Sequence, residues 1–191
     1  MGANMMLTIG AILIFGMFLS TTNKLMIGNN QIAAQNEYYI AGISLAQSII
    51  DEAKTKSFDE RTVGMDTMVA RTNMTAPASL TRDGVAEAVT LPDVMRTSNP
   101  FTARYPGYLS SVRFDDVDDY NRYSRIVNTK RAEGYRLFSS VRYGVETNPD
   151  VLVGSRTYCK VMTVKVTSPF FRKSTENGGP DTLTLSYTFT Y

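Results

Sequence analysis

The hydrophobic pattern of the first 56 residues predicts one long helix with two halves of different character. Residues 5–19 are nearly all apolar, and Lys24 is the only charged residue before Glu37. In the second half, apolar residues recur at spacings of four, three, four and three, which places them on one helix face. These residues are Tyr39, Ile43, Ala46, Ile50 and Ala53. The apolar half of such a helix must be buried in lipid or protein, and the apolar face of its second half must be buried against a domain.

The apolar half is short for a membrane span. The unbroken run at 5–19 falls below the roughly 20 residues that cross a bilayer, so a span has to include residues 20–27. A signal peptide is disfavoured, because no basic region precedes the run and no clear small-residue cleavage site follows it. The core helix of a soluble domain and a simple membrane anchor remain as alternatives.

The last third of the chain alternates strictly between apolar and polar residues, which predicts strands. We expect strands at residues 135–145, 156–167 and 182–191, with turns at Asn148–Asp150 and Asn177–Asp181. Three strands in sequence form an antiparallel meander with one face in need of cover. The amphipathic half of the helix is the obvious cover. The predicted fold class is therefore α+β, a long N-terminal helix packed on a C-terminal antiparallel sheet.

The segment between helix and sheet shows no sustained period. Prolines and glycines punctuate residues 57–109, which predicts loops with short elements, and residues 108–114 are a candidate first strand. A connection of this length is usually exposed and functional. We expect two parts, an assembly or membrane helix at 1–56 and a globular domain at 57–191, whose sheet occupies 110–191.

Composition narrows the classes of function. A net charge of +2 gives no sign of a nucleic-acid partner. Cys159 is the only cysteine, which excludes an intramolecular disulfide, and we expect it to be a small strand residue. The chain has no histidine, no phosphate-binding loop and no nucleophile elbow, so we predict neither an enzyme nor a cofactor.

Four aspartates lie close together before the predicted sheet. Asp115, Asp116, Asp118 and Asp119 offer oxygen ligands of the kind that Ca²⁺ prefers. Their spacing is not that of an EF-hand, so we favour a solvated turn in which aspartates cap backbone amides, with no metal. Asn73–Thr75 matches the glycosylation sequon, a pattern of low specificity.

The order of these features resembles the type IV pilin and pseudopilin family, and most closely its minor pilin or pilus-modification branch. The likeness rests on the helix end at 41–53 and 57–59, the loop at 114–121 and the strand at 161–166. It implies a structural subunit that is stored in the inner membrane before pilus machinery assembles it with identical subunits into an extracellular filament. In the family, a glutamate near the mature N-terminus pairs with the neighbouring subunit's terminal amine. Met5 or Leu7 stands at that position here, so the resemblance does not carry over this contact.

We therefore expect a subunit that polymerises through the apolar half of its helix. The residues expected in the filament core are Met5, Ile9, Ile12, Leu13, Phe15, Phe18 and Leu19. The alternatives are a membrane-anchored periplasmic binding or sensing domain, a pseudopilin that does not polymerise, and a tethered enzyme. In the filament we expect the helix to be interrupted between Gly16 and Gly28, where poor helix formers gather. The alternative is an intact helix with Ser and Thr hydroxyls bonded to carbonyls one turn earlier.

Overall fold

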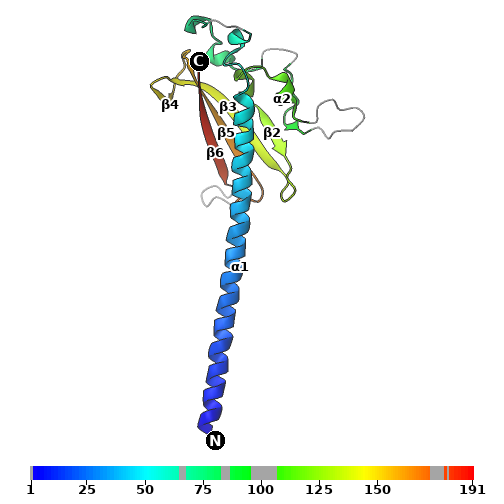
Figure 1. Cartoon of the computed structure of the whole chain (residues 1–191), viewed down its shortest axis with the longest axis vertical. Helices are drawn as coiled ribbons and strands as arrows, with labels where there is room; N and C mark the ends of the chain where they lie inside the picture. The colour runs from blue at the N-terminus through cyan, green and yellow to red at the C-terminus, as the bar shows by residue number, and fades with distance from the viewer. Residues whose placement is uncertain (1, 65–67, 83–86, 96–106, 173–178, 180) are drawn as a thin grey trace, which may run out of the picture. The chain divides into compact units, whose positions relative to one another are not determined.

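The structure, a computed structural model, describes the whole chain except residues 1, 65–67, 83–86, 96–106, 173–178 and 180. The chain divides into two units, Met1–Tyr38 and Tyr39–Tyr191. Helix α1 (Gly2–Ala53) forms the first unit and continues into the second. The second unit holds the sheet (Figure 1).

Helix α1 ends three residues before its predicted boundary of 56. The backbone N–H of Ser57 donates to the carbonyl of Asp115 at 2.9 Å, and the N–H of Val117 donates to the carbonyl of Ser57 at 3.0 Å. After Ala53 the N–H groups of Thr55 and Lys56 donate to carbonyls only three residues back, at 3.2 and 3.0 Å, and the bridge at Ser57 then leads the chain away from the helix.

The second unit is built on a six-stranded, mostly antiparallel sheet in the order β1-β2-β3-β5-β6, with β4 paired to β3. The strands are β1 (Asp93–Val94), β2 (Ser124–Val127), β3 (Tyr135–Val145), β4 (Asn148–Leu152), β5 (Cys159–Thr167) and β6 (Thr182–Thr190). Among the described strands, the short β1–β2 pair alone is parallel. The predicted α+β class is confirmed, and β3, β5 and β6 form the expected antiparallel meander.

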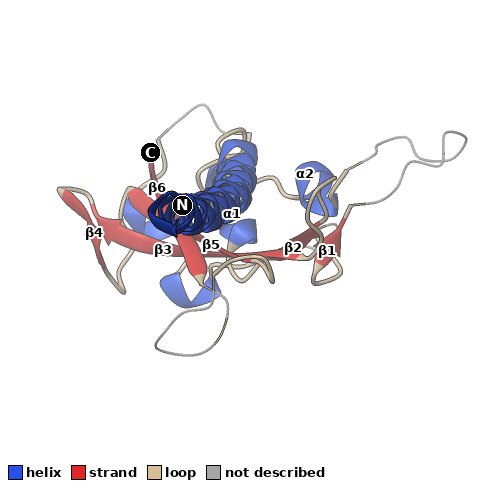
Figure 2. Cartoon of the chain, turned by 90° about the horizontal axis from the view of Figure 1, so that it is seen from below, coloured by secondary structure: helices blue, strands red, loops and turns tan. Residues whose placement is uncertain are grey.

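One face of this sheet carries the core. Along β5 the buried positions alternate, and Met162, Val164 and Val166 are fully buried. They pair with Val141, Ser139 and Leu137 of β3, all buried on the same face. The part of α1 in this unit, residues 39–53, covers that face (Figures 1 and 2). A helix that covers one face of an antiparallel sheet leaves the other face to polar side chains.

The helix face that meets the sheet differs in part from the expected one. Ala46, Ile50 and Ala53 are buried as expected and Tyr39 is half-buried, whereas Ile43 is 44 % exposed. The other buried positions of this face are Gly42 and Ile49. The reason is the ring of Phe171, which packs directly on Gly42 and stacks on Tyr39 with centroids 4.6 Å apart. The hydrophobic pattern did not predict Gly42 as a contact position, because the pattern counts only apolar side chains.

Residues 108–114, a candidate strand in the sequence, contain helix α2 (Leu109–Arg113) instead. The carboxylate of Asp93 accepts hydrogen bonds from the N–H groups of Leu109 at 3.2 Å and Ser110 at 3.1 Å. An acceptor at this place satisfies the free amides of a helix N-terminus. The strand prediction was wrong because the cap comes from a residue distant in the sequence.

Two predicted turns have different outcomes. Asn148–Asp150 lies within β4, so the predicted turn there was wrong, and β4 folds back on β3 directly after Glu146 and Thr147. Most of the turn predicted at Asn177–Asp181 lies outside the described residues. In the segment predicted as loops, the described part holds three short 3-10 helices, η1 (Glu60–Thr62), η2 (Arg71–Asn73) and η3 (Pro77–Ser79).

Candidate functional site

No other described part of the chain covers the apolar half of α1. The residues predicted to form a filament core are each between 46 % and 69 % exposed: Met5, Ile9, Ile12, Leu13, Phe15, Phe18 and Leu19. The helix is long and apolar enough to cross a membrane, by length and composition. None of its most apolar stretch is buried, which argues against the core helix of a soluble domain. The structure therefore contains an apolar surface that something outside the single chain has to cover.

Two threonine hydroxyls in this segment bond to carbonyls one turn earlier. The hydroxyl of Thr21 donates to the carbonyl of Met17, and that of Thr22 donates to the carbonyl of Phe18, both at 2.9 Å. Such bonds engage the donor of each of these hydroxyls within the helix. The helix of the single chain is uninterrupted through this region, and the interruption expected in a filament stays a prediction.

The glycines of the segment pack against no other part of the chain that the structure describes. A β-carbon added at Gly10, Gly16 or Gly28 would meet no atom within 4 Å. Each interior glycine costs a helix about 1 kcal/mol relative to alanine. Small residues on an apolar helix allow another helix to approach closely. A close approach of another helix is therefore sterically possible at these positions.

The four aspartates do not form one site. Asp116 accepts hydrogen bonds on Oδ1 from the backbone N–H groups of Asp118 at 2.7 Å and Asp119 at 3.1 Å. The predicted capping of backbone amides is thus confirmed. The turn, which includes the 3-10 helix η4 (Asp118–Tyr120), is not solvated, however. Asp116, Asp118 and Asp119 are buried and only Asp115 is exposed, so that part of the prediction was wrong.

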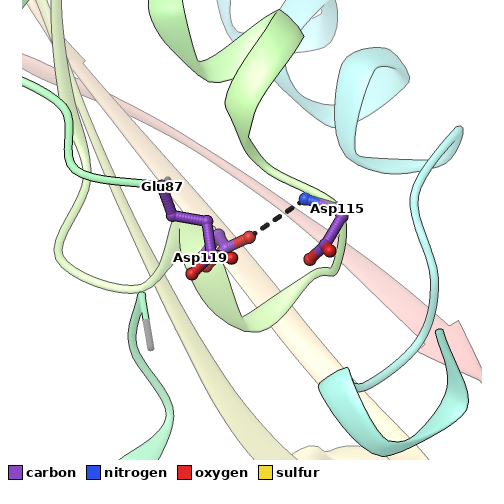
Figure 3. Close-up of side chains that lie close together, drawn as sticks. All are labelled: Glu87, Asp115 and Asp119. Atoms are coloured by element: carbon purple, nitrogen blue, oxygen red, sulfur yellow. Dashed lines mark hydrogen bonds between the residues drawn. The ribbon is translucent and has the colours of Figure 1, made fainter. Parts of the chain in front are cut away.

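A different set of three carboxylates gathers at this turn. Oxygens of Glu87, Asp115 and Asp119 lie within 4.8 Å of one another (Figure 3). Burial, and after it the charge of Glu87, raises the pKa of Asp119 to about 7. Ca²⁺ takes six to eight oxygens, so three monodentate carboxylates would supply only part of its ligands. Of the four predicted ligands, the structure brings only Asp115 and Asp119 into this set.

A fully buried lysine lies against the segment that follows α1. Lys160 of β5 places Nζ 2.7 Å from Oδ2 of Asp59 and 2.6 Å from Oδ1 of Asp118. It also donates to the carbonyl of Phe58 at 2.8 Å, and the Phe58 ring centroid is 4.6 Å away. Sequence reasoning missed this cluster, although Lys160 shares the inward face of β5 with Met162, a position where a hydrophobic residue is the norm.

The two aspartates beside Lys160 are in different electrostatic states. Burial acts to raise the pKa of Asp59, but the Lys160 charge and several hydrogen bonds outweigh it and hold that pKa below its usual value. Burial raises the pKa of Asp118 to about 6, against the opposing charge of Lys160 and with the help of the charge of Asp59. Asp59 therefore stays ionised, while Asp118 takes up a proton in mildly acidic solution.

A second ion pair, between a buried arginine and a half-buried glutamate, holds the end of α1 to the sheet. Arg125 of β2 donates from Nη2 to Glu52 of α1 at 2.7 Å and to the hydroxyl of Ser110 at 2.7 Å. Tyr120 donates to the same glutamate at 2.9 Å, and the Tyr108 ring lies 4.0 Å from the guanidinium carbon. Sequence reasoning did not find this pair, because its members are separated by 73 positions.

The described surface also contains an open pocket of about 960 Å³, between residues 68–79 and the side chains of Arg61 and Arg156. Its described lining has no carboxylate and no thiol, so it presents no acid–base pair for catalysis. Asn73 of the predicted sequon is exposed here, at the end of η2. Cys159 is buried as the first residue of β5, which confirms its predicted place.

The features of the chain are thus a long apolar helix with an uncovered surface and a domain in which a helix covers one face of a sheet. This arrangement is compatible with a pilin-like fold. Comparison with models of known protein families, with curated proteins and with solved structures found no match.

Proposed function

We propose that this protein is a structural subunit of an extracellular, pilus-like filament and that it polymerises through the apolar half of α1. The observation that carries the proposal is the uncovered apolar surface of residues 5–32. Burial of a large apolar side chain contributes about 1.5–3 kcal/mol relative to exposure in water. These exposed side chains require lipid or other protein around them. Fourteen of them lie between Met5 and Ile27: Met5, Met6, Leu7, Ile9, Ile12, Leu13, Ile14, Phe15, Met17, Phe18, Leu19, Leu25, Met26 and Ile27.

A filament core covers more of this surface than a bilayer does. A span of about 20 residues that includes residues 20–27 begins near residue 8. The apolar side chains of Met5, Met6 and Leu7 lie before it and that of Ile32 lies after it, and they are 58–79 % exposed. A bilayer leaves these four outside its hydrocarbon core, whereas neighbouring helices in a filament cover them as well. This favours polymerisation over a simple membrane anchor.

The assembly step follows from the change of surroundings. Before assembly, lipid covers the helix, and helices in lipid gain little from hydrophobic contact with each other. In a water-surrounded filament the same side chains bury against neighbouring copies, at about 25 cal/mol per Å² of apolar surface. Contacts between different patches of identical subunits do not close on themselves and propagate as a helix.

The test is to express the full chain in a cell with pilus assembly machinery and to shear the cell surface. We expect filaments in the sheared fraction, visible by electron microscopy and made of this chain. A membrane-anchored binding or sensing domain remains in the membrane fraction after shearing. Recovery of all of the protein in that fraction, with no filaments, contradicts the proposal.

A further inference from the structure

The buried group around Lys160 has the composition and geometry for a covalent bond between side chains. Its Nζ lies 2.6 Å from one carboxylate oxygen of Asp118 and 2.7 Å from one of Asp59. All three side chains are buried, with 0–1 % of each residue exposed. A lysine amine and a carboxyl group condense slowly in water, because they meet rarely and because both are charged. Here the fold holds them in contact and removes the water.

The hydrogen bonds separate the two aspartates into different roles. Asp59 accepts from the backbone N–H groups of Arg61 at 3.2 Å and Thr75 at 3.1 Å, and from the Tyr143 hydroxyl at 3.3 Å. These donors stabilise its carboxylate form. Asp118 accepts no hydrogen bond of this kind from the described residues, and its only close cation is Lys160. Asp59 is thus the ionised group beside the ammonium that can receive its proton, and Asp118, once protonated, is the carboxyl that a nucleophile attacks.

We propose that Lys160 and Asp118 join in an intramolecular isopeptide bond, with Asp59 as the general base and without any cofactor or second protein. The bond connects β5 to the η4 turn. This inference concerns the domain alone and does not depend on assembly into a filament.

The reaction balances with the groups present. Asp59 takes a proton from the Lys160 ammonium, and the neutral Nζ attacks Cγ of the protonated Asp118 carboxyl. The Nζ–Cγ bond forms and one Cγ–O bond breaks. The departing hydroxyl takes a proton that Asp59 relays from the nitrogen, and it leaves as water. Overall, an ammonium and a carboxylic acid give an amide, one water and one proton, and Asp59 returns to its carboxylate form.

Burial favours the amide product as well as the contact between the lysine and the carboxyl group. A buried ammonium loses its hydration, which the attraction of a neighbouring carboxylate offsets only in part. The amide is neutral, so condensation with the protonated Asp118 removes the ammonium charge from the interior, and the Asp59 carboxylate keeps the N–H donors of Arg61 and Thr75. The rings of Phe58 and Tyr143, with centroids 4.6 Å and 5.4 Å from Nζ, line the group on the lysine side.

The test is the intact mass of the purified full chain after denaturation. We expect a mass lower than that of the sequence by one water, and a protease digest in which the peptides of Lys160 and Asp118 are linked. A mass equal to that of the sequence overturns the proposal and leaves a buried ion pair. A link to Asp59 instead of Asp118 overturns the assigned roles.

Three variants make the result specific. Lys160→Arg keeps the positive charge, but a guanidinium does not act as the nucleophile. The measured mass of this variant should therefore equal the mass calculated from its own sequence, with no water lost. Asp118→Asn should lose ammonia in place of water and so reach the same final mass as the reacted wild type. Asp116→Asn alters a neighbouring buried carboxyl and should still lose one water. Loss of the mass change in Asp116→Asn, with the fold intact, contradicts the assignment.

Discussion

The ring of Phe171 closes on the backbone of Gly42, and a β-carbon at Gly42 would lie 2.8 Å from Cζ of Phe171. Real side chains essentially never approach this closely. The same ring stacks on Tyr39 with an interplanar angle of 4°. The glycine therefore sets how closely residues 39–53 of α1 approach the domain.

The first prediction concerns this contact. Gly42→Ala should destabilise the domain, because overpacking costs about 1–3 kcal/mol and exceeds the roughly 1 kcal/mol that alanine adds to a helix. Thermal unfolding followed by circular dichroism measures the difference. Gly28→Ala is the matched control, since nothing lies within 4 Å of its added carbon, and it should not lower the melting temperature. Equal melting temperatures for Gly42→Ala and wild type would show that the contact is not tight.

The second prediction concerns assembly. Replacement of Ile12 and Phe15 by aspartate should abolish filaments, because two charges would enter a core without water. The domain should remain folded, since both positions are exposed and lie outside the unit that holds the sheet. Filament yield in the sheared fraction is the measurement. The control replaces the same two residues by leucine and should assemble, and normal filaments from the aspartate variant would refute the proposed core.

The third prediction concerns the ion pair of Glu52 and Arg125. Glu52→Ala leaves a buried guanidinium without its carboxylate, and we expect a loss of about 3–5 kcal/mol in the free energy of unfolding. Denaturation of the full chain in mild detergent, with urea, measures this loss. Asp51→Ala on the same helix breaks the exposed pair with Lys54 and should cost less than about 1 kcal/mol. Similar losses for the two variants would contradict the difference in burial.

The fourth prediction concerns pH. Burial raises the pKa of Asp119 to about 7 and that of Asp116 to about 9, from an ordinary value of 3.8. A raised pKa in the folded state means that protonation stabilises the fold. This contribution is complete below the ordinary value and is lost as the pH rises through 7 and then 9. Asp59, whose pKa is lowered, has the opposite effect and matters only below its ordinary value.

We therefore expect the melting temperature to be highest in mildly acidic solution and to fall by several degrees toward about pH 9. Thermal unfolding at intervals across this range is the measurement. Asp119→Asn keeps an oxygen for the N–H of Asp115 but removes the titration, so the fall near neutral pH should become smaller. A melting temperature that rises steadily with pH would contradict the burial of these carboxyls.

Much of the fold follows from local patterns in the sequence. The alternation around Met162 and Val164 identifies the inward face of β5, because burial on a strand repeats every two residues. The helical spacing of Ala46, Ile50 and Ala53 identifies the face of α1 that covers the sheet for the same reason, with a period of 3.6 residues. The uncovered apolar run before Lys24 is equally visible in the sequence.

The tertiary structure decided how the polar residues are paired. In the sequence, Lys160 is only one polar position in a predicted strand. The fold brings the carboxylate of Asp59, 101 positions away, against its ammonium. The sequence of the α2 segment suggested a strand, whereas in the structure Asp93 caps its N-terminus and the segment is helical. Periodicity reports whether a face is buried, which is a local property. Which charge meets which depends on the three-dimensional fold, because a buried charge requires a partner and the chain supplies it from any distance in the sequence.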